Sequence, residues 1–202
     1  MMARPRVHDD QLRLRLLDQA GELISAHGQG GLSLRRLAAQ SGTSTTAVYS
    51  LFGSKAAVLR AVYIEAFHRL RARLEAVPLS GDPLADLLEL GLAYRRSALA
   101  NPHLYAVMFH RGGAVELEPD EATAAAAAAA MRPLAETVAR GIAAGLLLDR
   151  PAEEITYACW AQVHGMVSLE LDEAIPAGVS SDRSYPEALR ATIRGWHPNA
   201  GA

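Results

Sequence analysis

The chain has 202 residues, half of them hydrophobic and 21% charged, with a formal net charge of −2. This length and composition allow one large or two small globular domains with a sizeable core. Cys159 is the only cysteine, which excludes an internal disulfide and fits a reducing, cytoplasmic setting. We expect no signal peptide and no membrane span, because the longest apolar run covers residues 124–131 and a bilayer needs roughly 20 residues.

Charge is divided unevenly along the chain. Residues 1–75 hold 11 Arg or Lys against 6 Asp or Glu, and residues 76–202 hold 9 against 16. A basic first part suits a module that approaches phosphate groups. Chance clustering of surface charge gives the same pattern, so the motifs have to distinguish the two.

The first predicted helix covers residues 10–27 and is followed by a glycine-rich loop. Its predicted buried stripe has helical spacing and consists of Leu16, Leu17, Ala20, Leu23, Ile24 and His27. We expect His27 to be a helix-end or partly buried residue, not a ligand. Arg4 and Arg6 precede it. They are either a basic arm that reaches phosphates or the minor groove, or a disordered tail.

Two short helices with a tight turn between them are predicted next. Ser33 and Ser44 are each placed to cap a helix, because a serine hydroxyl can accept a hydrogen bond from a free amide of the first turn. Gly42 stands where the first helix needs a left-handed residue to end. Gly53 ends the second helix, and Ser54 caps a third one that is predicted to run to about residue 76.

This arrangement is typical of a helix-turn-helix unit, whose second helix lies in the major groove of DNA. Thr45 and Thr46 can offer hydroxyl or methyl groups to base edges, and Tyr49 can place its hydroxyl on a phosphate. Lys55 opposes the dipole of the helix that it begins, and a nearby phosphate would explain its presence. The predicted DNA-binding residues are Ser33, Arg35, Ser44, Thr45, Thr46, Tyr49 and Lys55. The alternative is an ordinary short pair of helices.

Pro78, Gly81 and Pro83 interrupt the chain and mark a predicted domain boundary. Beyond this boundary, one helix is predicted to begin at 82 and another at 102. Three further helices are predicted over residues 120–148, 151–172 and 184–195. A loop bracketed by glycines at 112 and 113 and by Pro119 separates two of them. No segment shows the clean alternation of a strand, so the predicted fold is all-α.

An apolar ligand pocket in the second half is predicted from its aromatic and sulfur-containing side chains, although their helical spacing also fits an ordinary core. The candidates are Tyr94, Tyr105, Met108, Phe109 and Trp160. The alanines at 124–130 are either a cavity wall or compositional drift on a helix, and glycines at 141 and 145 suit close packing.

Neither a metal site nor a catalytic site is predicted. The possible ligands lie too far apart in sequence for a tight chelating pair; they are His103, His110, Cys159 and His164. Gly-x-Ser-x-Gly, His-Glu-x-x-His and phosphate-binding glycine loops do not occur, so we expect no enzymatic activity and no cofactor.

The helix-turn-helix segment closely resembles the DNA-binding domain of the TetR/AcrR family of bacterial transcriptional regulators. Its members share an apolar–Ser/Thr–apolar triplet, an Ala-x-x-x-Gly block and a Tyr-x-x-Phe-x-Ser-Lys block, which stand here at 32–34, 38–42 and 49–55. The resemblance is strong over about residues 10–62. A weaker one, to a subgroup with a Trp-x-x-x-His-Gly stretch, involves residues 160–170 and 101–109.

Two positions depart from the family pattern. Thr43 stands where a small apolar residue is usual, and Thr45 and Thr46 stand where a basic and then a small residue are usual. These departures leave the operator sequence open.

The resemblance implies three parts: a DNA-binding domain at 1–53, a linker helix at 54–78 and a helical ligand-binding and dimerisation domain at 79–202. In the resembled family the last two helices of each subunit pair into a four-helix bundle, a role that falls here to 151–172 and 184–195. The interface residues expected from this are Ile155, Cys159, Gln162, Gly165, Met166 and Leu169.

We therefore expect a homodimer that binds a palindromic operator in double-stranded DNA and acts as a repressor responding to a small-molecule effector. Two alternatives stay open. One is a helical interaction or ligand-sequestering protein that does not bind DNA. The other is an all-α enzyme that uses His164 or His110.

Overall fold

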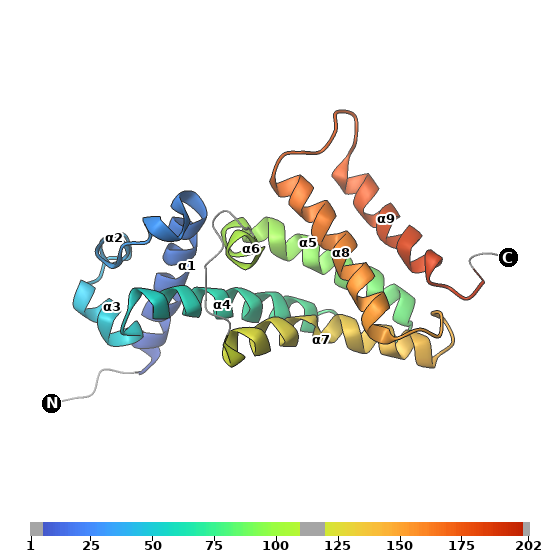
Figure 1. The fold of residues 1–202 in the computed structure, drawn as a ribbon, viewed down its shortest axis with the longest axis horizontal. Helices are drawn as coiled ribbons and strands as arrows, with labels where there is room; N and C mark the ends of the chain where they lie inside the picture. Colours follow the sequence, from blue (N-terminus) through green and yellow to red (C-terminus); the bar gives the residue numbers. More distant parts are fainter. Residues whose placement is uncertain (1–5, 110–119, 200–202) are drawn as a thin grey trace. The chain divides into compact units, whose positions relative to one another are not determined.

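The computed structural model describes residues 6–109 and 120–199, which fold into helices joined by short loops, without a strand among them (Figure 1). The helices are α1 (Arg6–Gly31), α2 (Leu34–Gln40), α3 (Thr45–Phe52), α4 (Lys55–Glu75), α5 (Pro83–Ala100), α6 (Pro102–Phe109), α7 (Glu121–Ala143), α8 (Ala152–Leu171) and α9 (Ser181–Gly195). The predicted all-α class is confirmed.

The chain divides into two compact units. One consists of Met1–Arg69 and Asn101–Ala127, and the other of Leu70–Ala100 and Ala128–Ala202. Helices α4 and α7 contribute residues to both. The first unit therefore includes α6, which the boundary expected at residue 78 assigned to the second domain.

The apolar stripe predicted for the first helix forms the centre of the first unit. Its five apolar residues are at most 3% exposed, and they pack with buried residues of α2, α3 and α4 such as Val48 and Val62. His27, the sixth predicted member, is exposed where the helix approaches its break. Helix α1 breaks at Gly28, whose φ of 67° and ψ of 179° are not helical. The first helix thus ends close to its predicted boundary, and a further turn follows the break.

Helix α6 packs against α1 at Gly21. A Cβ placed on this glycine would lie 3.0 Å from Cδ2 of His103 and 3.1 Å from Cδ2 of Leu104. The missing side chain therefore lets the two helices approach closely. Leu104 and Val107 join the same core as the α1 stripe, which is why α6 belongs to the first unit.

In the second unit α5, α8 and α9 pack against one another, and Leu87, Val138, Leu147 and Ile155 form a buried cluster. Two networks of charged side chains connect its elements. Arg95 of α5 donates to Glu170 at 2.7 and 2.6 Å and to Asp182 at 2.7 Å, which ties α5 to α8 and α9.

The other network surrounds Asp86, which is 1% exposed. Its carboxylate accepts hydrogen bonds from the backbone amide and the hydroxyl of Ser80, at 2.8 and 2.7 Å, and from Arg140 Nη2 at 2.8 Å. These donors, those of Ser80 first, lower the pKa of Asp86 below its usual range.

Helix α7 ends at Ala143, five residues before its predicted end at 148. Gly145 has a φ of 67°, so it takes the left-handed conformation that ends a helix instead of allowing close packing. Gly141 does allow close packing: a Cβ there would lie 2.7 Å from Cδ1 of Leu147, which folds back over it.

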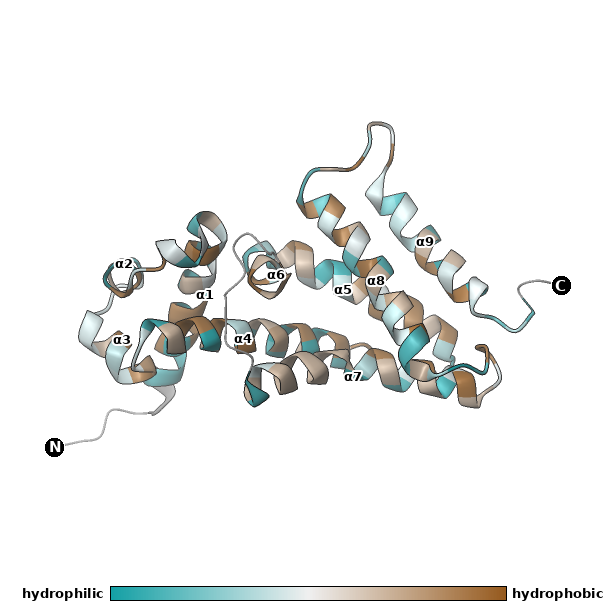
Figure 2. Ribbon diagram, in the orientation of Figure 1, coloured by the Kyte–Doolittle hydropathy of each residue, from teal (hydrophilic) through white to brown (hydrophobic). Residues whose placement is uncertain are grey.

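Helices α8 and α9 differ in polarity, since α9 carries fewer hydrophobic residues than α8 (Figure 2).

The loop predicted at 112–119 lies outside the described residues. No single helix of the described part is long and apolar enough to cross a membrane; α3 and α4 meet that test only when joined, and they are bent by 66°.

Candidate functional site

The helix-turn-helix is built from local caps, as its sequence predicts. Ser33 Oγ accepts from the amide of Arg36 at 3.5 Å, and Ser44 Oγ accepts from the amide of Ala47 at 3.1 Å. Gly42 has a φ of 64° in the turn between α2 and α3. These contacts fix where α3 begins and so set the direction in which its first residues project.

Helix α3 is anchored on one side and exposed on the other. Val48 is 0% exposed in the core of the first unit, whereas Tyr49 is 53% exposed and Thr46 is also exposed. Thr45 is half-buried at the first helical position. Ser50 is exposed as well, four residues after Thr46, and helical periodicity alone would have identified it as a further candidate.

The far end of α3 is held by Phe52. The guanidinium of Arg13 in α1 lies 4.9 Å from the centre of its ring, and Phe52 packs against the core of the first unit. A cation over an aromatic face is attracted by the ring quadrupole. Helix α3 is therefore fixed at both ends, which suits a helix that has to keep its register in a groove.

The charge in the sequence around α3 is entirely positive. Residues 23–64 contain no Asp or Glu, and they include Arg35, Arg36 and Lys55. Arg35 and Arg36 are exposed, and Arg36 Nη2 lies 3.2 Å from Nε2 of His27. Lys55, at the first position of α4, forms no ion pair within the described part of the chain.

Arg60, the next cation, is already paired. Its Nε and Nη2 donate to the carboxylate of Asp120 at 2.7 and 3.0 Å. This guanidinium, together with amides at the start of α7, lowers the pKa of Asp120 to about 2. Arg35 and Arg36 of α2 and Lys55 at the start of α4 thus remain as candidates for a phosphate contact. Arg4 and the side chain of Arg6 lie outside the described residues.

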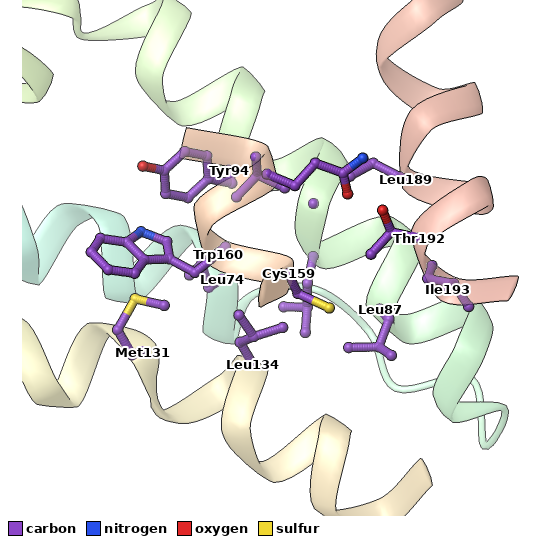
Figure 3. Close-up of a pocket in the computed structure, with 14 residues that line it drawn as sticks. Leu74, Leu87, Tyr94, Met131, Leu134, Cys159, Trp160, Leu189, Thr192 and Ile193 are labelled. Atoms are coloured by element: carbon purple, nitrogen blue, oxygen red, sulfur yellow. The ribbon is translucent and has the colours of Figure 1, made fainter. Parts of the chain in front are cut away.

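A cavity lies in the second unit, lined by residues of α5, α7, α8 and α9 and by Leu74 of α4 (Figure 3). Two of the five predicted ligand-binding residues, Tyr94 and Trp160, line it. The Tyr94 hydroxyl and Nδ1 of His164 are 3.2 Å apart.

The other three predicted ligand-binding residues do not line this cavity, because they belong to the first unit. Tyr105 is 1% exposed, and Met108 packs against the core around α1. Phe109 contacts the rings of Tyr105 and Phe67, with centres 5.0 and 5.9 Å away. These three side chains thus contribute to the interior of the first unit and not to the cavity.

The residues predicted for a dimer interface lie on different faces of α8. Ile155 is 0% exposed, and Cys159 and Gln162 line the cavity, so these three face their own chain and leave little for a partner to cover. Gly165 and Leu169 are exposed, and Met166 is half-buried. Of the predicted interface residues, Gly165, Met166 and Leu169 thus remain at least partly accessible to a partner.

The exposed side of α8 carries a stripe with a spacing of four residues. It consists of Tyr157, which is 66% exposed, Ala161, Gly165 and Leu169, which is 51% exposed. A Cβ on Gly165 would meet no atom of the described residues within 4 Å, so its surroundings are open. Tyr157 and Ala161 were not among the predicted interface residues, because a face that meets the chain's own core and an exposed apolar face have similar composition.

The histidines considered for a metal site do not come together. His103 lies in the first unit, His164 lies in the second, and His110 lies outside the described residues. No group of three or more His, Cys, Asp or Glu side chains within the described part is arranged to hold a metal ion.

Comparison with known proteins finds family models over both the N-terminal and the C-terminal part of the chain. Residues 16–62 match the family described as bacterial regulatory proteins, tetR family, and residues 87–192 match the tetracyclin repressor-like C-terminal domain. The HTH-type transcriptional regulator Rv1816 of Mycobacterium tuberculosis is 27% identical over 141 residues. That alignment covers 67% of this chain, and the chain spans only 59% of the relative's length.

Solved structures match over nearly the whole chain. A protein with unknown function from Rhodococcus sp. RHA1 is 30% identical, with a TM-score of 0.78 over 92% of this chain and 95% of that one. The TetR family transcriptional regulator PfmR from Thermus thermophilus is 25% identical, with a TM-score of 0.66 over 89% and 94%. With its two halves matching the two parts of that family in order, this chain belongs to the tetR family of bacterial regulatory proteins.

Proposed function

We propose that the chain is a transcriptional regulator that binds a palindromic operator in double-stranded DNA as a homodimer. The observation that carries this proposal is the exposed face of α3. Thr46, Tyr49 and Ser50 present hydroxyl groups on a helix that is anchored at both ends and flanked in sequence only by positive charge. Such a face suits contacts to base edges and phosphates in the major groove.

The exposed stripe of α8 supports a twofold interface. Tyr157, Ala161, Gly165 and Leu169 are uncharged and lie on one side of the helix. Small residues at Ala161 and Gly165 would let a second copy of the helix approach closely, with Tyr157 and Leu169 packing at the ends. A twofold dimer would present two α3 helices to half-sites about 34–36 Å apart.

The proposal is tested by titrating salt against DNA binding. The full chain is mixed with labelled DNA from the region upstream of its own gene, and affinity is measured by fluorescence anisotropy. If Arg35, Arg36 and Lys55 of both subunits contact phosphates, the logarithm of affinity should fall with that of salt with a slope of roughly −5. Scrambled DNA of equal length is the control and should bind more weakly.

The rival function is a helical interaction or ligand-sequestering protein that does not touch DNA. It predicts equal, weak binding to both DNA fragments and no steep salt dependence. The exposed hydroxyl-bearing face of α3 favours the regulator, because a purely structural pair of helices has no need of it.

The cavity of the second unit is the proposed site of a small-molecule effector. A ligand that binds more tightly to a dimer with a different separation of the α3 helices would release DNA by a population shift. Repression that is relieved by the effector is the simplest version of this mechanism. Anisotropy of the protein–DNA complex with and without candidate effectors measures its direction.

A further inference from the structure

The cavity of the second unit has an uncharged lining, because none of the described residues that line it is Asp, Glu, Lys, Arg or His. Its wall is formed mainly by leucines and other apolar side chains of α5, α7, α8 and α9. Figure 3 shows the Thr192 hydroxyl and the Cys159 sulfur among these apolar groups. A charged ligand group would therefore lose its hydration without meeting an opposite charge.

The thiol of Cys159 does not supply a charge either. Burial disfavours the thiolate and raises the pKa of Cys159 to about 11. At neutral pH the side chain is a neutral, weakly polar group. The polar groups described along this cavity are thus all uncharged.

One of these polar groups lacks a partner. Gln162 lines the cavity, and its Nε2 donates to the backbone carbonyl of Ala188 at 3.0 Å. This hydrogen bond leaves the amide oxygen, Oε1, as the acceptor that remains. Oε1 is buried and has no hydrogen-bond partner among the described residues. A buried acceptor without a donor is costly, and a ligand donor that reached it would remove that cost.

From this combination we propose that the effector is a neutral, mainly apolar molecule with a hydroxyl or similar donor group that binds Gln162 Oε1. This inference rests on the proposed function for its biological role, since only a DNA-binding regulator has an effector. It adds the chemical class of the ligand and the residue that selects it.

The size of the cavity adds a mechanical consequence. Its volume is about 40 Å³, whereas an engineered cavity that holds benzene measures roughly 150 Å³. A ligand must therefore displace side chains. Leu189 of α9 packs closely on Gly91 of α5, since a Cβ on this glycine would lie 2.7 Å from Leu189 Cδ1. A ligand that displaced Leu189 would therefore act on the contact between α5 and α9.

The test uses three probes of similar shape: cyclohexanol, which has a donor, methoxycyclohexane, which has none, and cyclohexanecarboxylate, which is charged. Binding to the full chain is followed by tryptophan fluorescence, because Trp160 lines the cavity. The alcohol should bind roughly threefold to tenfold more tightly than the ether, and the carboxylate should not bind. Gln162→Met should abolish the preference for the alcohol, and Gln11→Met, an exposed position on α1, should keep it.

The inference is overturned by equal binding of alcohol and ether to the wild type, by binding of the carboxylate, or by an unchanged preference in Gln162→Met. The comparison of the three probes on the wild type stands by itself if that variant does not fold. DNA binding is measured separately without any probe. Loss of DNA binding would reject the proposed regulator and leave the cavity chemistry intact, whereas intact DNA binding with the wrong probe selectivity would reject this inference alone.

Discussion

Replacing Lys55 by glutamine should change DNA binding and folding in opposite directions. Lys55 is the first residue of α4, where the helix dipole disfavours a cation, and no ion pair within the described part of the chain compensates for it. Removing the charge should therefore raise the free energy of unfolding by about 0.3–1 kcal/mol. The neighbouring cap of α4, Ser54 Oγ accepting from Ala57 at 3.1 Å, stays in place in the variant.

The same substitution should weaken binding to DNA. Each lost phosphate contact reduces the slope of log affinity against log salt by about 0.9, so a dimer should lose about 1.8. Raising the salt from about 50 to about 200 mM should then cost the wild type roughly twelvefold more affinity than it costs the variant. Because the lost contact is to the backbone, the reduction should be the same for every DNA sequence.

Two measurements check this prediction: anisotropy titrations at four salt concentrations and chemical denaturation of the free protein. The control is Arg150→Gln, which removes one exposed positive charge in the loop between α7 and α8 and should leave the salt slope unchanged. An unchanged slope in Lys55→Gln would show that Lys55 does not contact a phosphate. A clear loss of stability would show that the side chain has a structural role instead.

Three further changes test other parts of the molecule. Thr46→Ala should alter the base preference at one or two positions by roughly 1–3 kcal/mol in a competition assay with single-base variants, and unaltered selectivity would place Thr46 outside the groove. Asp86→Asn should lower the free energy of unfolding by about 2 kcal/mol at pH 7. Because the native pKa of Asp86 is lowered, this difference should be complete above the unfolded pKa of about 3.9 and shrink as the pH falls below it; denaturation curves that keep a constant gap down to pH 3 would contradict the assignment. Leu169→Arg should give monomers in size-exclusion chromatography while Leu79→Arg, at an exposed loop position, should not; dimers in both variants would mean that the interface lies elsewhere.

The parts of the fold that could be predicted are those decided by neighbours in sequence. The caps at Ser33 and Ser44 and the turn at Gly42 depend on a few adjacent residues, and the structure has them as expected. The end of α7 depends on Gly145 in the same local way. It was mispredicted because a glycine one turn after Gly141 also suits close packing, and only the backbone angle separates the two uses.

The parts that could not be predicted depend on contacts between distant segments. The placement of α6 beside α1 follows from Gly21, about 80 residues earlier in the chain, and nothing in the local pattern of α6 announces it. This contact takes Tyr105 into the first unit and leaves Tyr94 and Trp160 at the cavity. In the same way, the face of α8 that meets the chain's own core is as apolar as the exposed stripe, so composition alone cannot rank them.

Lys55 is the only lysine in the sequence, and it stands beside the proposed DNA-binding face. Acylating reagents that attack amines therefore have one side-chain target in this protein. Bound operator would shield that target, and acylation in its absence would erase the charge that the phosphate needs. The yield of the peptide that carries acylated Lys55, measured by mass spectrometry, would thus report the fraction of the regulator that is bound to its operator.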